Sequence, residues 1–496
     1  MKEARDAVRP SAWERADEAI EEARRAGAAY ADARVVERSS RRLHVKNGLV
    51  AEISEEEDAG LAVRALAGGT WGFAATADLT SGGIARAVRA ALAQARLSDR
   101  RGIVPVRLVP EAPPVGAWAT PVEIDPWQVP LQEQVDLLLR ADAAMRAVRG
   151  VTNSEATLRF DRARQRFVST EGARIDQRIV HTGAGCEARA FRDGVITRRS
   201  WPNAAGGQHA SRGWELALEV DLPGNASRIA EEAVALLDAP PCPSGEMDVI
   251  LGGAMLALQI HESIGHPTEL DRILGWEAVV AGTSYLEPDS IGAFRLGAPI
   301  VDVVADARLE HGAGAGTFGY DDEGVPAQSV DLVREGVVVG SLSGRESAAR
   351  AGLARSGGAV RAEGWNRFPL VRMTNVSLLP RAGRLADLIA DTRDGLLLDV
   401  DYSWSIDDKR LNFQFGTEIG WRIREGRLEE MVSGATYGGI TPAFWAACDA
   451  ICGPEEWTLW GFADCGKGHP MQSMSTAHGA APARFRKVRV GYRGAS

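Results

Sequence analysis

The six-residue segment His261-Glu262-Ser263-Ile264-Gly265-His266 most strongly limits how this chain can fold, because two histidines flank a glutamate at an unusual spacing. In the zinc-binding helix pattern H-E-x-x-H, the histidines are four residues apart and lie on one face of the helix. Here they are five residues apart, a separation that rotates through about 140° in a regular helix. Gly265 tolerates the backbone angles of a bulge, and Pro267 cannot continue an ordinary helix. The sequence therefore predicts a helix that bulges or ends at Gly265.

Two imidazoles beside a carboxylate are typical of a catalytic zinc site. Such a site uses three protein ligands and keeps a fourth position open for water. The metal lowers the pKa of that water towards about 7, and a neighbouring carboxylate accepts the proton and passes it to the leaving amine. We therefore predict that His261 and His266 bind one Zn²⁺ per chain and that Glu262 is the general base of a metallopeptidase. The alternative is a chance occurrence of the pattern in a chain with eight histidines.

The third zinc ligand cannot be identified from spacing, because any segment that the fold brings close could supply it. The candidates are Glu269, the pair Glu310-His311, and the segment from Asp464 to His469, which contains Cys465. Cys465 lies between an aspartate and a Gly-x-Gly turn, which predicts a sharp and accessible loop. That setting suits a thiolate ligand better than a core cysteine.

The charge balance argues against a nucleic-acid-binding protein. The chain has 57 Lys and Arg residues against 67 Asp and Glu residues, and no long basic stretch. Phosphate binding depends on clustered positive charge, so we expect no nucleic-acid partner. The amino-terminal segment lacks the apolar core of a signal peptide, and no apolar run approaches about 18 residues. These features predict a cytoplasmic protein without membrane contact, and the five scattered cysteines predict no disulfide framework.

The hydrophobic patterning predicts an α+β protein with more than one core, since single cores stop growing at roughly 250 to 300 residues. Helices are expected at residues 11–28, 81–97, 131–148, 226–237, 254–265, 347–352, 385–391 and 442–451. Strands are expected at residues 31–37, 43–45, 49–53, 61–66, 70–74 and 247–251, and within 151–201. Asn47-Gly48 and Gly68-Gly69 are hairpin signals.

The order of helix, strands and helix recurs in the first half of the chain. Residues 59–69 align with residues 184–194 at an offset of 125, which marks a candidate internal repeat; the alternative is two similar hairpins. The expected fold is an amino-terminal α/β sandwich-like lobe, followed by a mostly β carboxy-terminal domain that carries the HExxxH helix. The predicted parts are an amino-terminal α+β domain (1–100), a connector (101–128), a central α+β domain (129–239), a proline-rich linker (240–246) and a carboxy-terminal metallopeptidase domain (247–496).

Several further segments resemble the TldD branch of the TldD/PmbA metallopeptidase family, and the resemblance covers nearly the full chain. Besides HESIGH, the matching segments are residues 30–34 (Tyr-Ala-Asp-Ala-Arg), 72–74 (Gly-Phe-Ala), 320–328 (Tyr-Asp-Asp-Glu-Gly-Val-Pro-Ala-Gln), 372–375 (Arg-Met-Thr-Asn), 465–467 (Cys-Gly-Lys) and a closing strand near Gly491.

The resemblance implies a site and an activity. In that family two motif histidines and a carboxy-terminal cysteine bind zinc and the motif glutamate is the base, which implies His261, His266, Cys465 and Glu262 here. It further implies a protease of small or unfolded peptides that works as a dimer, either a homodimer or a heterodimer with a sister subunit lacking the motif. One departure is residues 401–410, which replace an expected glycine-rich stretch and leave the partner and the substrate range open. They are compatible with a homodimeric subgroup.

Three other functions stay open at this point. The chain could be a non-catalytic binding or regulatory subunit with a structural zinc of four protein ligands. It could be a DNA-associated modulator, which the acidic balance disfavours. It could also resemble dipeptidyl peptidase III, which uses the same histidine spacing with a glutamate as third ligand.

Some residues have both a functional and a structural interpretation. His469 and His478 could stabilise an oxyanion or orient the substrate. The acids at 321–323 could be partners of the zinc histidines, or a solvated turn. For Cys448 and Cys452, on a predicted helix, core packing is preferred over metal binding. For Trp457 and Trp460, packing is the ordinary alternative to a peptide groove.

Overall fold

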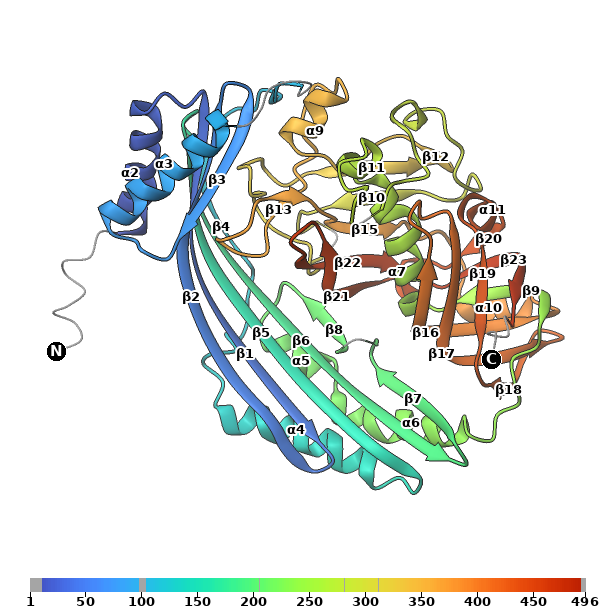
Figure 1. The fold of residues 1–496 in the computed structure, drawn as a ribbon. Coiled ribbons are helices and arrows are strands. Elements are labelled where there is room, and N and C mark those ends of the chain that lie inside the picture. Colours follow the sequence, from blue (N-terminus) through green and yellow to red (C-terminus); the bar gives the residue numbers. More distant parts are fainter. Residues whose placement is uncertain (1–10, 98–103, 205, 281, 311, 492–496) are drawn as a thin grey trace.

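Two structural halves make up the chain, and one long sheet dominates the first (Figure 1). The structure is a computed structural model that describes residues 11–97, 104–204, 206–280, 282–310 and 312–491. The first half is an eight-stranded sheet with helices at both ends, and the second contains a six-stranded and a seven-stranded sheet around one buried helix. It is a mixed α and β fold with a β-rich carboxy-terminal region.

The elements of the first half are α2 (Ala12–Arg25), β1 (Tyr30–Lys46), β2 (Leu49–Ala67), β3 (Thr70–Thr76), α3 (Ser81–Leu97), β4 (Val115–Ala119), α4 (Leu131–Arg146), β5 (Val151–Ser169), β6 (Arg174–Arg192), β7 (Val195–Trp201), β8 (Gln208–Ala210), α5 (Glu215–Glu219) and α6 (Leu222–Ala235). The strand order is β3-β2-β1-β5-β6-β4, and β7 and β8 also pair with β6. β4 lies within the predicted connector.

Strands β1 and β2 are far longer than the short strands expected from the sequence, with 17 and 19 residues. Their middle parts are polar, so apolar alternation does not reveal them there. They remain paired because charges match across the strands, as where Arg41 Nε lies 2.6 Å from Glu55 Oε1. The hairpin predicted at Asn47-Gly48 is confirmed, and both residues have positive φ, as this two-residue turn requires.

The recurring order of elements is visible in the long sheet. β2 and β6 have 19 residues each, and Leu49 corresponds to Arg174 at the offset of 125. β3 and β7 have seven residues each, and Thr70 corresponds to Val195 at the same offset. The two sets of strands join through the antiparallel pair β1 and β5. One sheet therefore contains strands from both sides of the predicted connector. The division of this half into two domains stays a prediction.

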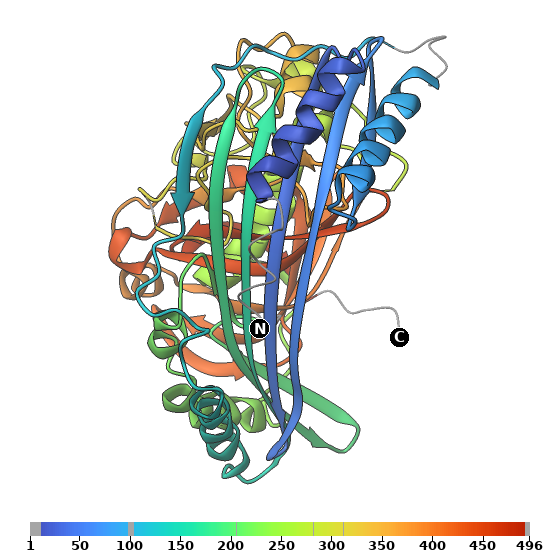
Figure 2. The same cartoon turned by 90° about the vertical axis from the view of Figure 1, so that its left-hand side faces the viewer.

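Helices cover the sheet at its two ends. Ser11 caps α2 in a reciprocal arrangement with Glu14, and the apolar faces of α2 and α3 form one core with β1 and β2. Figure 2 shows α2 over the outer face of the sheet, with the second half of the chain behind it. α4 and α6 form a second core at the other end, with β5 and β6.

The elements of the second half are β9 (Gly245–Leu251), α7 (Gly253–Ile260), a π-helix (His261–Gly265), a 3₁₀-helix (His266–Thr268), α8 (Leu270–Ile273), a 3₁₀-helix (Pro288–Ser290), β10 (Val303–Asp306), β11 (Ser329–Arg334), β12 (Val337–Val338), α9 (Arg345–Arg350), β13 (Val360–Arg361), β14 (Leu370–Val371), β15 (Asn375–Leu378), α10 (Leu385–Ala390), β16 (Asp394–Ile406), β17 (Asn412–Arg424), β18 (Arg427–Val432), β19 (Thr436–Ile440), α11 (Thr441–Ala446), β20 (Cys448–Ile451), a 3₁₀-helix (Pro454–Glu456), β21 (Thr458–Lys467), β22 (Gln472–Ala480) and β23 (Ala483–Val490).

Helix α7 is buried along its whole length between the two sheets of the second half. The six-stranded sheet has the order β12-β11-β10-β15-β22-β21, and the seven-stranded sheet has β16-β9-β23-β19-β17-β18 with β20 on β23. Met255, Leu256 and Ile260 belong to the largest apolar cluster, which joins both sheets. A helix that is apolar all round is stable only inside such a core. This burial fixes the position of the segment that follows α7.

The helix predicted at 442–451 is partly wrong. α11 ends at Ala446, and Cys448–Ile451 is strand β20, because it pairs with β23 at the edge of the sheet. None of the described helices combines the length and apolar character needed to cross a lipid bilayer.

Candidate metal centre

The motif histidines lie at the two ends of a π-helical segment. α7 passes into a π-helix at His261, and the backbone N–H of His266 donates to the carbonyl of His261. This i to i+5 hydrogen bond is the π pattern, which adds one residue to a helical turn. The extra residue therefore brings both imidazoles to one side, and their ring centroids lie 4.8 Å apart.

Gly265 is needed for a reason other than the one inferred from the sequence. Its φ of −55° and ψ of −64° are ordinary helical values that any residue adopts. A Cβ atom there would lie 2.1 Å from Met373 Sδ, however, so the present packing of Met373 leaves no room for a side chain at this position. Pro267 lies at the start of the 3₁₀-helix His266–Thr268, which ends the π segment.

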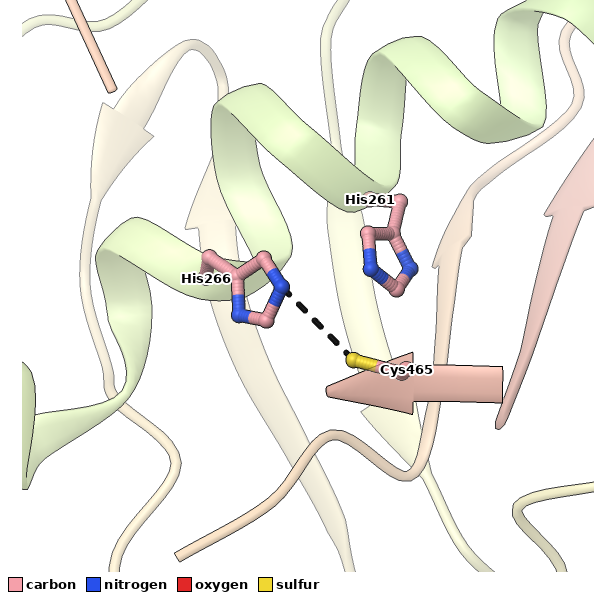
Figure 3. Close-up of side chains that lie close together, drawn as sticks. All are labelled: His261, His266 and Cys465. Carbon is pink, nitrogen blue, oxygen red and sulfur yellow. Dashed lines mark hydrogen bonds between the residues drawn. The ribbon is translucent and has the colours of Figure 1, made fainter. Parts of the chain in front are cut away.

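The structure brings the side chains of His261, His266 and Cys465 together (Figure 3). One ligand atom from each lies within 4.8 Å of the others, and Cys465 Sγ is 3.6 Å from His266 Nε2. The three residues and Glu262 are only 3–6% exposed. Two nitrogens and a sulfur of this kind are a donor set for zinc.

Cys465 does not lie on an accessible loop, so that expectation is wrong. It is buried in β21 and pairs with Met474 of β22. The register shifts between Phe462 and Cys465, and such a bulge re-aims side chains. The hairpin, rather than a turn, presents the thiol to the histidines.

His478 fixes the protonation of His261. His478 Nδ1 donates to the carbonyl of Val376 at 2.9 Å, and its Nε2 lies 2.7 Å from His261 Nδ1. Burial holds the pKa of His478 well below 6.5, so His478 is neutral and its Nε2 accepts. His261 therefore donates from Nδ1 and keeps a lone pair on Nε2. From the sequence, His478 could stabilise an oxyanion or orient the substrate; in the structure it contacts the ring of His261 instead.

His266 has an equivalent partner in Glu269. Its Nδ1 donates to Glu269 Oε2 at 3.0 Å, which leaves Nε2 facing Cys465. Glu269 also lies 3.3 Å from both Lys467 Nζ and Arg272 Nε. Burial alone would raise the pKa of Glu269, but Lys467 and His266 hold it well below 4.5. Glu269 thus orients His266 and is not one of the three clustered donors.

The electrostatics favour the metal-binding form of each donor. Burial lowers the pKa of His261 to about 4 and also lowers that of His266, so both imidazoles are neutral at pH 7. Burial would raise the pKa of the Cys465 thiol, but the charge of Arg372 and contact with His266 outweigh burial and lower it. Arg372 also donates to the Cys465 carbonyl. Neutral imidazoles and an acidic thiol fit Zn²⁺.

Glu262 points to a cation from another part of the chain. Its Oε2 lies 2.6 Å from Nη1 of Arg410, which lies in the segment 401–410 that departs from the family pattern. The sequence did not identify Arg410, Arg372 or Lys467 as site residues. Arg372 and Lys467 lie in segments that resemble the family, and Arg410 lies in the segment that departs from it. No spacing rule connects any of the three with HESIGH.

Two neighbouring cavities lie beside this group. The first, of about 240 Å³, is lined by Arg410, Gly466 and Lys467. The second, of about 540 Å³, has Trp276, Val279, Val280, Phe368, Leu370 and His469 among its lining residues. Val280 and Gly468 line both cavities. His469 is exposed and lines the second cavity.

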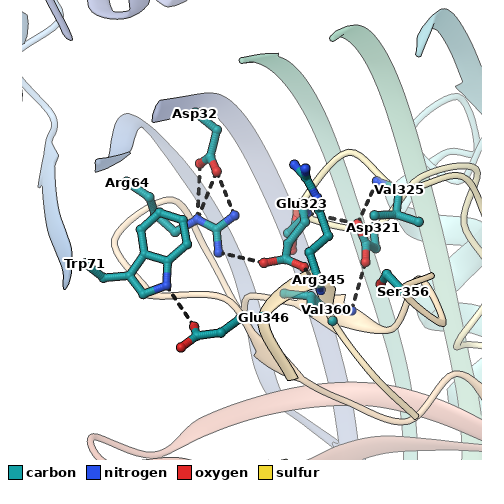
Figure 4. Close-up of polar contacts among 12 residues, drawn as sticks. Asp32, Arg64, Trp71, Asp321, Glu323, Val325, Arg345, Glu346, Ser356 and Val360 are labelled. Atoms are coloured by element: carbon teal, nitrogen blue, oxygen red, sulfur yellow. Dashed lines mark hydrogen bonds and ion pairs between the residues drawn. The ribbon is translucent and has the colours of Figure 1, made fainter. Parts of the chain in front are cut away.

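The acidic segment 321–323 is neither a solvated turn nor a partner of His261 and His266. Glu323 Oε1 lies 3.1 Å from Arg64 Nη1, and Arg64 pairs with Asp32 at 2.6 Å (Figure 4). Asp321 accepts backbone N–H groups of Glu323, Val325 and Val360. Glu323 therefore connects the long sheet to the second half of the chain, and Asp321 holds the turn around it.

The remaining candidates have structural positions. Cys448 and Cys452 belong to different apolar clusters, and burial raises the pKa of each thiol to about 12. Trp457 and Trp460 pack against the core. His311 lies outside the described residues.

Comparison with known proteins gives the family. Models of the PmbA/TldA metallopeptidase family match residues 31–95 (domain 1), 124–237 (central domain) and 244–491 (carboxy-terminal domain). The chain therefore belongs to the PmbA/TldD metallopeptidase family.

Named relatives agree with this assignment, and solved structures share the fold. A metalloprotease of Methanothermobacter thermautotrophicus is 29% identical over 463 residues, covering 93% of this chain and 95% of the relative. A zinc metalloprotease TldD homologue of Saccharolobus solfataricus is 25% identical over 248 residues, 50% of this chain and 52% of the relative. TldE from Thermococcus kodakarensis has the same fold, with a TM-score of 0.73 at 14% identity over 96% of this chain and all of that one. So does a Thermotoga maritima protein described as a candidate DNA gyrase modulator, with a TM-score of 0.75 at 16% identity over 97% of this chain and all of that one.

Proposed function

We propose that this protein is a zinc-dependent peptidase in which His261, His266 and Cys465 hold the metal and Glu262 is the general base. The observation that carries the proposal is the convergence of three metal-binding side chains within 4.8 Å, with Glu262 beside His261 in the same π-helical turn. The metalloprotease and zinc metalloprotease names of the relatives support it.

Each residue has a defined part in the proposed reaction. When bound, Zn²⁺ supplies a Lewis acid that polarises a carbonyl and makes hydroxide available near neutral pH. Glu262 accepts a proton from the attacking water and passes it to the leaving amine as the C–N bond breaks. His478 and Glu269 keep the two imidazoles in the ligand tautomer, and Arg372 favours the thiolate.

Burial supports small or unfolded peptides as substrates. A folded protein cannot place a peptide bond against side chains that are 3–6% exposed, whereas a single extended chain can. Trp276, Val279 and Val280 line the nearby 540 Å³ cavity and are exposed to solvent. Val279 is 96% exposed. Exposed apolar patches mark binding sites for apolar groups, which unfolded peptides display. We therefore propose that apolar side chains of the substrate occupy this cavity.

Glu262→Gln tests the proposal. This variant keeps the size of the side chain but cannot accept a proton, so cleavage of an unfolded peptide falls by about 10²- to 10⁴-fold. Zinc per chain, measured by metal analysis, stays at one. A wild-type cleavage rate in this variant would refute the proposed base.

A structural zinc is the competing function. It would need four protein ligands. In the described parts of the chain, the cluster contains three donors of the His, Cys, Asp and Glu types, which favours an open position. A phosphinic peptide, which carries a tetrahedral anion in place of the scissile bond, should bind at an open metal position. If the spectrum of the cobalt-substituted protein does not change when this peptide is added, the structural zinc is favoured.

We further propose a cytoplasmic dimer, of two copies or with a sister subunit lacking HESIGH. The five cysteines are free, as expected in a reducing compartment. Light scattering of the purified chain, alone and with such a sister subunit, distinguishes the two assemblies.

A further inference from the structure

Arg410 is the residue near the centre that the proposed chemistry does not yet use. Its Nη1 donates to Glu262 Oε2 at 2.6 Å, and this is the side-chain hydrogen bond that the structure records for Glu262. The Arg410 side chain is 19% exposed and the Glu262 side chain 8%. A charge-assisted bond at this burial is strong and directional. Arg410 therefore controls the orientation of the carboxylate assigned as the base.

The fold holds Arg410 in place through an irregular turn between β16 and β17. Asp407 accepts backbone N–H groups of Leu411 and Asn412, and its own carbonyl accepts the N–H of Arg410. Thr441 donates to the Arg410 carbonyl at 2.9 Å. Arg410 has a φ of 63°, a region that residues other than glycine rarely adopt. Such backbone strain is common where a side chain must be presented at a functional site.

Arg410 also lines a cavity beside the metal centre. It lines the 240 Å³ cavity together with Gly466 and Lys467, which directly follow Cys465. Lys467 is buried and bonded to Asp271 and the Val371 carbonyl, so its ammonium group is already occupied. The buried Nε of Arg410, by contrast, has no partner among the residues that the structure describes. Arg410 is thus a cation beside the base, and the structure records a hydrogen bond for one of the five N–H donors of its guanidinium.

We propose that Arg410 is a catalytic residue, which holds Glu262 ready for proton transfer and stabilises the negative charge that develops on the substrate carbonyl oxygen. This inference rests on the proposed peptidase function. Arg410 stays protonated throughout and transfers no proton, since a guanidinium is not deprotonated in proteins. Donors placed where charge develops stabilise the transition state more than the bound substrate. Removing Arg410 therefore lowers kcat and leaves KM nearly unchanged.

Arg410→Gly and Arg410→Lys test the proposal. Glycine accepts the positive φ of this position without strain, so R410G removes the side chain and keeps the turn. We expect kcat for an unfolded peptide to fall by about 10²-fold in R410G, as for loss of one oxyanion donor. Added guanidinium ion should restore part of the activity of R410G, and R410K should retain part of it. Zinc content should equal that of the wild type.

A binding measurement provides a readout that does not depend on turnover. A phosphinic peptide carries a tetrahedral anion in place of the scissile bond. By calorimetry its affinity should fall by about as much as kcat does in R410G, while the affinity of the amine product peptide, which lacks the new carboxylate, stays unchanged. The matched control is Arg393→Ala, since Arg393 is 87% exposed and pairs with Glu425 at the surface.

The outcomes separate this inference from the proposed function. If the wild type cleaves peptides and R410G matches it in kcat and in phosphinic-peptide affinity, Arg410 has no catalytic part and the peptidase proposal stands. A rise in KM alone in R410G would also overturn it. If the wild type cleaves no peptide and binds no phosphinic peptide, both proposals fail together.

Discussion

His261 Nδ1 and His478 Nε2 lie 2.7 Å apart, so a histidine 217 residues further along the chain sets the tautomer of the first motif histidine. His478 is held in turn by the carbonyl of Val376, on the neighbouring strand β15. The metal centre therefore depends on the packing of β15 and β22 against α7.

His478→Ala should weaken zinc binding by about 10- to 100-fold, because His261 loses the partner that orients its ring. Competition with a fluorescent zinc chelator measures the affinity. His469→Ala is the matched control, since His469 is exposed in the neighbouring cavity. Equal zinc affinity in His478→Ala and the wild type would contradict this prediction.

Cys465→Ser should abolish both zinc retention and peptide cleavage, because a serine hydroxyl is a poor zinc ligand at neutral pH. Metal analysis after dialysis checks the first effect. Cys452→Ala is the control and should keep its zinc, since Cys452 packs in a separate apolar cluster. Retained zinc and activity in Cys465→Ser would instead favour a glutamate as third ligand.

Val280→Asp should raise KM for peptides with apolar side chains by roughly tenfold, because it places a charge between the two cavities. A peptide-library digest compared with that of the wild type should show the same loss. Val195 is an exposed valine on β7, so Val195→Asp should change neither KM nor the result of the digest. An unchanged KM in Val280→Asp would exclude this cavity as the substrate site.

Arg64→Ala should lower the free energy of unfolding by about 3–5 kcal/mol, because it leaves Asp32 and Glu323 buried without their partner. Urea unfolding measures the change. Arg393→Ala should cost less than about 0.5 kcal/mol, since its pair with Glu425 is exposed. Similar free energies of unfolding for the two variants would show that the ion pairs of Arg64 contribute little to stability.

Asp161→Asn should reduce stability at neutral pH and have little effect in acid. Burial would raise the pKa of Asp161, but Arg159 and Arg38 outweigh burial and lower it to about 2. A carboxyl with a depressed folded pKa stabilises the protein above its unfolded pKa of about 3.9, and this contribution is lost as the pH falls through 2. The free energy of unfolding of the variant should be lower than that of the wild type by about 2 kcal/mol at pH 7. Urea unfolding at pH 7 and near pH 2 measures this difference. A difference that persists near pH 2 would assign the effect to packing.

Much of the local structure could be predicted because its causes are local. Ser11 and Glu14 cap α2, and Asn47-Gly48 forms the turn that its backbone preference requires. The lengths of β1 and β2 could not be predicted, since their polar middles are held by pairing with distant strands. β20 replaced the end of a predicted helix for the same reason.

At the metal centre, the sequence alone determined the donor groups on HESIGH, because they follow from side-chain chemistry. It also determined the need for an irregular helix, because the two histidines are five residues apart. Only the tertiary structure decided which distant groups meet them. It brought the bulged strand β21 with Cys465, the ring of His478 and the guanidinium of Arg410 to one place. Contacts between residues more than 100 positions apart leave no periodic trace in a single sequence, since they arise from the packing of α7 between two sheets.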